Sequence, residues 1–223
     1  MPSPILFISY VFFTFKSLNP FYILNYSSQR RTVLHLIMKN SLLVVCLLLS
    51  AIISTQAQKF RGADKSAMDM AFYPDNYAHD HKTIGDGKAL IRVLYSRPAR
   101  NGREVFGKLV PYGKVWRTGA NENTEIKFYK DATIQGKKVK AGTYSLFTIP
   151  GETEWTIILN SDLDYWGAFS YNEANDVLRV KVPSIKLTEP LEVFSIRMAK
   201  GEADNAIMSM GWDTTAVDVP VSF

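Results

Sequence analysis

Alternation of apolar and polar residues with a period of two is the main pattern of the chain after Lys88. Between Val177 and Val182, for example, every second residue from position 178 is apolar, whereas Arg179 and Lys181 point to the opposite side of an extended strand. Such alternation predicts strands with one buried face and one solvated face. Gly, Asn, Asp and Pro separate these runs at intervals of roughly 8–12 residues, a spacing typical of all-β domains.

The runs rich in Val, Ile, Phe, Tyr and Thr predict about nine strands. They cover residues 89–95, 125–129, 132–134, 142–149, 155–160, 177–182, 191–198, 206–212 and 216–221. The helical signal in this region amounts to a single turn at 172–176, so there are no crossover helices to join parallel strands. We therefore expect an all-β fold, an antiparallel β-sandwich of jelly-roll-like type, with a closed barrel as the alternative.

The sequence before residue 58 has a different character. Residues 1–37 are mainly aromatic and aliphatic, and we interpret them as an over-extended gene start outside the fold. Met38 begins a better-formed export signal, with Lys39, an apolar run of about 12 residues and a small-residue cleavage pattern that ends at Ala57. That run is shorter than the roughly 20 residues of a membrane-spanning helix. We expect a signal peptide over 38–57, a periplasmic or extracellular product, and no stable membrane span after cleavage.

Two regions are expected in the chain that remains. Residues 58–87 mix charges with Gly, Asp and Met, which predicts a loosely ordered lead-in with at most one short strand. Residues 88–223 form the predicted β-sandwich domain. This is long enough to bury a sizeable core without disulfides or metals.

Charge and cysteine content exclude several functions for the exported part. Four of the 26 Lys and Arg residues lie before residue 58, which leaves 22 against 21 Asp and Glu and a net charge of +1. A nucleic-acid partner is not expected, because such proteins carry a clustered basic excess. The one cysteine, Cys46, lies in the predicted signal peptide, so the exported part has no disulfide or thiolate chemistry. Phosphate loops and dinucleotide fingerprints are also absent, and we expect no cofactor.

Several motifs in the order of the chain carry a family resemblance. They begin with Tyr95-Ser-Arg-Pro98, Leu109-Val-Pro-Tyr-Gly113 and Val115-Trp-Arg-Thr-Gly-Ala-Asn121, and continue with Ala141-Gly-Thr-Tyr-Ser-Leu-Phe147, Ile149-Pro-Gly151, Trp166-Gly-Ala168 and Asp176-Val-Leu-Arg179. Over about residues 89–221 the chain resembles an exported bacterial family known as domain of unknown function 2911. The resemblance implies an exported β-sandwich, typical of Bacteroidota, and no assigned reaction.

The same motifs supply the candidate ligand-binding residues. Arginine offers a planar set of donors for carboxylate or phosphate groups, tryptophan offers a flat surface for a sugar ring, and asparagine both donates and accepts hydrogen bonds. The candidates are Arg97, Arg103, Trp116, Arg117, Asn121 and Trp166. They suggest a binding module for a saccharide or a small anionic group. The alternative is a structural or envelope-interaction protein, in which these Trp and Arg side chains anchor a long loop to the sheet.

No complete catalytic set can be assembled from the sequence. His79-Asp80-His81 would need further ligands to hold a metal, and we interpret it as a polar loop rather than a metal site. A carboxylate-dependent hydrolase would require Glu122 to meet Asp162 or Asp164 across two loops, and we treat these acids as solvated surface residues. We therefore name no catalytic residue and no metal ligand, and the pattern leaves the oligomeric state open.

Overall fold

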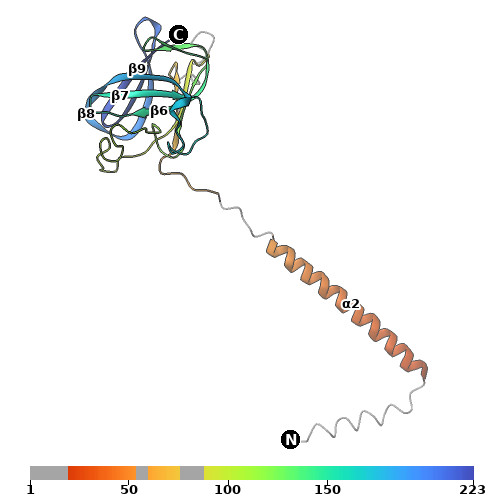
Figure 1. Ribbon diagram of the computed structural model, residues 1–223. Coiled ribbons are helices and arrows are strands. Elements are labelled where there is room, and N and C mark those ends of the chain that lie inside the picture. Colours follow the sequence, from red (N-terminus) through yellow and green to blue (C-terminus); the bar gives the residue numbers. More distant parts are fainter. Residues whose placement is uncertain (1–19, 54–59, 76–87) are drawn as a thin grey trace. The chain divides into compact units, whose positions relative to one another are not determined.

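The computed structural model describes residues 20–53, 60–75 and 88–223 (Figure 1). The chain divides into two compact units, Met1–Arg61 and Gly62–Phe223. The first contains the helix α2 (Pro20–Ile53). Among the described residues, no helix combines the length and the apolar character that a membrane crossing requires. The predicted cleavage site after Ala57 lies outside the described residues, so the signal peptide stays a prediction.

The second unit is a nine-stranded antiparallel sheet with the strand order β1-β2-β3-β6-β7-β8-β9-β4-β5. The strands are β1 (Met68–Tyr73), β2 (Ile91–Ser96), β3 (Thr124–Phe128), β4 (Ala132–Ile134), β5 (Lys137–Val139), β6 (Gly142–Ile149), β7 (Glu154–Asn160), β8 (Asp176–Lys200) and β9 (Ala206–Ser222). Two single 3₁₀ turns, Glu173–Asn175 and Glu202–Asp204, precede β8 and β9. The prediction of an antiparallel all-β fold of about nine strands is confirmed.

The lead-in contains the one short strand that the sequence allowed, β1, which pairs with β2 over its whole length. The other strands differ from the prediction in two places. The short strand β5 was not predicted, because Lys137-Lys-Val139 has no alternating pattern of its own. The four last predicted runs join into two long strands, β8 and β9, whose ladder continues through register shifts between Lys186 and Ser195.

The long strand β8 carries the chain from one layer of the fold to the other. Its first part pairs with β7, from Asp176 to Pro183, and from Ser184 onward it pairs with β9 instead (Figure 1). The sheet therefore folds over on itself and encloses a core between its layers. As the sequence pattern predicts, Leu178, Val180 and Val182 face that core while Lys181 is exposed.

An aromatic cluster closes one part of this core. Trp155 of β7, Phe194 of β8 and Trp212 of β9 pack there with Phe106 and Trp116 from the long connection between β2 and β3. The rings of Trp116 and Trp212 are stacked, with centroids 6.1 Å apart and planes 19° apart. Because two loop residues complete the core, the connection is fixed to the sheet by apolar packing.

Candidate functional site

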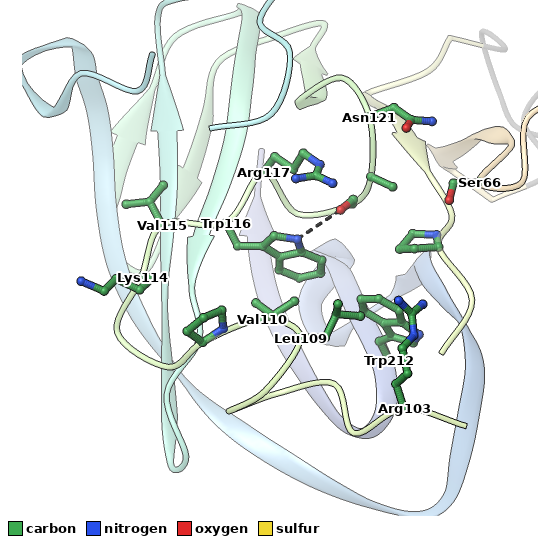
Figure 2. Close-up of a pocket in the computed structure, with 14 residues that line it drawn as sticks. Ser66, Arg103, Leu109, Val110, Lys114, Val115, Trp116, Arg117, Asn121 and Trp212 are labelled. Atoms are coloured by element: carbon green, nitrogen blue, oxygen red, sulfur yellow. Dashed lines mark hydrogen bonds between the residues drawn. The ribbon is translucent and has the colours of Figure 1, made fainter. Parts of the chain in front are cut away.

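The connection between β2 and β3, residues 97–123, forms most of the wall of a cavity of about 450 Å³ (Figure 2). Its first residues pair with β8: Phe194 donates from its backbone nitrogen to the carbonyl oxygen of Pro98 at 3.0 Å, and Arg100 donates to Glu192 at 2.8 Å. The cavity lining also includes Ser66, before β1, and Trp212 of β9. Four of the six candidate residues line it: Arg103, Trp116, Arg117 and Asn121.

The Trp116 side chain lines the cavity but belongs mainly to the core. Only 7% of its surface is exposed, and its indole N–H donates a 3.1 Å hydrogen bond to the carbonyl oxygen of Gly119 (Figure 2). One face of the ring is stacked with Trp212. The polar atom and much of the ring are therefore already engaged, which leaves little flat surface on which a sugar could pack.

The Arg117 guanidinium is the most unusual charged group of the cavity. It is half-buried, and burial lowers its pKa from the ordinary arginine value. Its Nε is buried and has no hydrogen-bond partner. Among the described residues, no carboxylate lies within ion-pair distance of this side chain. A partly desolvated cation without a counter-ion gains more from an anionic ligand than a fully solvated one does.

Two further cations line the cavity. The Arg103 side chain is held by backbone carbonyls, with Nε 2.8 Å from the oxygen of Arg100 and Nη2 2.7 Å from that of Ala99. Lys114 lies at the rim, with its amino group turned outward (Figure 2). Within the described part of the chain, neither forms an ion pair, and no acidic residue lines this cavity. The lining therefore has an uncompensated positive charge.

The loop that carries Arg117 is held in an unusual conformation. Thr118 has φ +57° and Asn121 has φ +56°, although β-branched residues such as Thr rarely adopt positive φ. Thr118 is fully buried, and its hydroxyl lies 3.1 Å from that of Thr148 on β6. The Thr124 hydroxyl donates to the carbonyl oxygen of Thr118 at 2.7 Å. Surrounding contacts thus hold a strained loop in place, a feature that is enriched at functional sites.

Asn121 lies at the edge of the cavity. Its side-chain amide donates a 3.1 Å hydrogen bond to Oδ1 of Asp64, and its backbone oxygen accepts one from Gly167 at 3.0 Å. These bonds join the loop to the segment before β1 and to the loop after β7. Its side chain has one acidic neighbour, so its contribution to an anion site is smaller than that of Arg117.

Arg97 lies outside the cavity. It reaches across to β8, where its Nε is 3.2 Å from the carbonyl oxygen of Phe194 and its Nη2 is 2.8 Å from the hydroxyl of Ser195. Its Nη1 forms a 2.9 Å ion pair with Asp69 of β1. All of these contacts join strands, so Arg97 is placed to hold the edge strand β1 and the second part of β8 together.

Trp166 lines a different, smaller cavity of about 320 Å³. Its neighbours there include Glu122, Glu125 and Asp164, so the structure does bring two of the three acids singled out in the sequence to one cavity. Asp162 instead belongs to a partly buried polar network, in which its backbone oxygen accepts a hydrogen bond from Ser145 and its carboxylate accepts one from Asn175.

Among the residues of the larger cavity that sequence reasoning missed are Trp212 and Lys114. Trp212 reaches it from β9 and Lys114 from the connecting loop. Lys114 follows a Pro-Tyr-Gly turn beside the candidate motif, so its position in the sequence could have marked it as a candidate. Nothing local in the sequence marks Trp212, which comes from a strand about 90 residues further on and meets the loop only through tertiary packing.

Within the described residues, no group of three or more His, Cys, Asp and Glu side chains is arranged to hold a metal ion. The His79-Asp80-His81 segment lies outside the described residues, so the interpretation of that segment stays a prediction.

Comparison with known proteins shows to which family the chain belongs. A family model described as protein of unknown function (DUF2911) matches residues 78–221. The chain belongs to this family. No curated protein and no solved structure matches it.

The DUF2911 match covers β2 to β8, nearly all of β9 and the whole connection between β2 and β3. Arg103, Trp116, Arg117 and Asn121 therefore all lie in the part of the chain that defines the family, whereas Ser66 lies before it. The family carries no assigned activity, so only the geometry of the cavity indicates a function.

Proposed function

We propose that this DUF2911 protein is exported and binds a small anionic molecule in the cavity between the β2–β3 connection and β9. The observation that carries the proposal is the half-buried guanidinium of Arg117, which has no counter-ion among the described residues. Carboxylate and phosphate groups match the donor geometry of arginine. Arg103 supplies a second cation in the lining of the same cavity.

The cavity lining also suggests what else the ligand carries. Leu109, Val110, Pro98 and the edges of two tryptophans provide apolar surface beside the cations. A cavity of about 450 Å³ is within the usual range for small-molecule sites, roughly 300–1,000 Å³. The best match is therefore an anionic group on a compact apolar body.

An anion is favoured over the saccharide alternative for a specific reason. Sugar rings pack on exposed aromatic faces, but Trp116 is buried and stacked with Trp212. The exposed tryptophan, Trp166, lies at the other cavity. The larger cavity thus has the charges for an anion but lacks an open ring for a sugar.

The test is isothermal titration of the purified protein with phenyl phosphate, inorganic phosphate and a neutral monosaccharide. We expect phenyl phosphate to bind most tightly, and Arg117→Gln to weaken its binding about tenfold, which corresponds to about 1.4 kcal/mol. Arg197→Gln is the matched control, because Arg197 is exposed on β8 and lies outside the cavity.

Two results would overturn the proposal. One is the absence of saturable binding for both anions. The other is an Arg117→Gln variant that keeps its wild-type fold by circular dichroism and binds phenyl phosphate as tightly as Arg197→Gln does. Mass spectrometry of the secreted product tests the export part of the proposal, for which we expect Gln58 as the first residue.

A further inference from the structure

A second groove, independent of the anion cavity, lies on the outer face of the sheet. Leu94 of β2 and Glu125 of β3 are cross-strand partners whose neighbours Val93 and Ile126 point into the core. Together with Met68 of β1 they form the floor of the cavity of about 320 Å³. The surface that this groove exposes is mainly apolar.

Trp166 forms the wall of the groove and is unusually accessible. It is 59% exposed, whereas Trp116, Trp155 and Trp212 are all buried. Met68, on the floor, is 57% exposed. Large apolar side chains that remain exposed next to each other in a concave site often mark a surface for a ligand or partner.

The loop that presents Trp166 is firmly attached to the sheet. Trp166 forms an antiparallel bridge with Glu122, and the backbone nitrogen of Asn123 donates to the carbonyl oxygen of Tyr165 at 3.0 Å. The side chain of Asn123 is buried and accepts a 2.8 Å hydrogen bond from the backbone nitrogen of Tyr165. The indole is therefore positioned by a fixed backbone, which lowers the entropic cost of binding.

The charge of the groove indicates the charge of the ligand that it favours. Glu122, Glu125 and Asp164 line it together with the apolar residues, and no lysine or arginine does. Within the described residues, none of these three carboxylates forms an ion pair. A tryptophan ring attracts cations through its negative face, so the aromatic and the acidic residues favour the same ligand charge.

We propose that the groove of Met68, Leu94, Glu122, Glu125, Asp164 and Trp166 binds a small organic cation. The ligand class is an ammonium, amidinium or guanidinium group on a flat or aliphatic body. The apolar part packs against Trp166 and Met68, and the cationic group faces the carboxylates of Glu122 and Glu125. A volume of about 320 Å³ suits a small molecule better than a folded partner.

The test is isothermal titration of the purified full-length protein with benzamidine, and with benzamide as its uncharged analogue. We expect saturable binding of benzamidine and no detectable binding of benzamide. The double variant Glu122→Gln/Glu125→Gln should bind benzamidine at least about fivefold more weakly, because it loses both ion pairs to the ligand, each of which is weakened by solvent. Trp166→Ala should remove the binding.

Glu189→Gln is the matched control, because Glu189 is an exposed acid on β8 outside the groove. Its affinity for benzamidine should equal that of the wild type, and thermal melts should show that every variant is folded. Equal binding of benzamide and benzamidine would overturn the proposal. So would unchanged benzamidine affinity in the folded double variant, or no saturable binding by the wild type.

Discussion

At Gly119 the cavity loop passes so close to β2 that no side chain fits. A Cβ at this position would lie 2.9 Å from the carbonyl oxygen of Ser96 and 3.2 Å from the hydroxyl oxygen of Thr124. The carbonyl of Gly119 also accepts the indole hydrogen bond of Trp116. We expect Gly119→Ala to displace the loop, to lower the stability by about 1–3 kcal/mol, and to weaken phenyl phosphate binding because Arg117 moves with the loop.

Thermal denaturation and titration of Gly119→Ala measure both effects. The control is Gly62→Ala, where an added Cβ meets no atom within 4 Å. That variant should melt and bind like the wild type. If Gly119→Ala matched Gly62→Ala in both measurements, the close approach of the loop to β2 would have no energetic consequence.

The residues of the cavity loop show which features of the site the sequence predicts and which it does not. The motif around Trp116 and Arg117 supplied both residues as candidates, and both line one cavity, although the tryptophan is mostly buried in the core. The positive φ of Thr118 could not be predicted, because threonine disfavours it and only tertiary contacts hold it there. The adjacent Arg117 is half-buried and has no counter-ion among the described residues, which a local pattern does not reveal.

At the level of strands, Arg97 connects three of them. Its guanidinium bonds to Asp69 of β1 and to Phe194 and Ser195 of β8, while its own backbone follows β2. The side chains of the Arg97–Asp69 pair are 37% and 43% exposed, so solvent weakens this ion pair. We expect Arg97→Ala to lower the free energy of unfolding by about 1–2 kcal/mol and to leave phenyl phosphate affinity unchanged.

Urea denaturation and titration separate these two outcomes for Arg97→Ala. Arg197→Ala serves as the comparison, since it removes an exposed arginine of β8 that lines neither cavity. A loss of phenyl phosphate affinity in Arg97→Ala at unchanged stability would contradict the structural role of this residue. It would indicate instead that Arg97 takes part in ligand binding.

The strands show which strand boundaries an alternating sequence pattern can predict and which it cannot. The ends of β4 and β6 match the predicted ranges, because each lies between clear turn residues. In contrast, the Pro and Glu residues near 187–190 resemble a loop, although β8 continues through them. Its ladder with β9 is interrupted and resumes on both sides of that stretch, so the continuity depends on the partner strand rather than on local preference.

Across the whole β-sheet unit, the two proposed sites are lined by neighbouring residues of one loop and have opposite charge. Arg117 belongs to the first cavity, and Glu122 and Glu125 belong to the second. The Nη1 of Arg117 lies 3.9 Å from the position that a Cβ would take on Gly167, the neighbour of Trp166. In the sequence these charges lie close together, from Arg117 to Glu125, but they line two different cavities of the folded protein, where the loop pairs with residues 165–167.

This arrangement predicts positive coupling between the two ligands. The charge of Arg117 repels a cation in the groove, and a phosphate bound to Arg117 cancels that repulsion. Saturating phosphate should therefore tighten benzamidine binding by about two- to fivefold, and benzamidine should tighten phosphate binding by the same factor, because linkage is reciprocal. Titrations at about 0.02 M and about 0.3 M salt measure the effect, which should shrink as the Debye length falls below roughly 10 Å. Arg117→Gln should abolish it, whereas weaker benzamidine binding in phosphate would show that the ligands compete for one site.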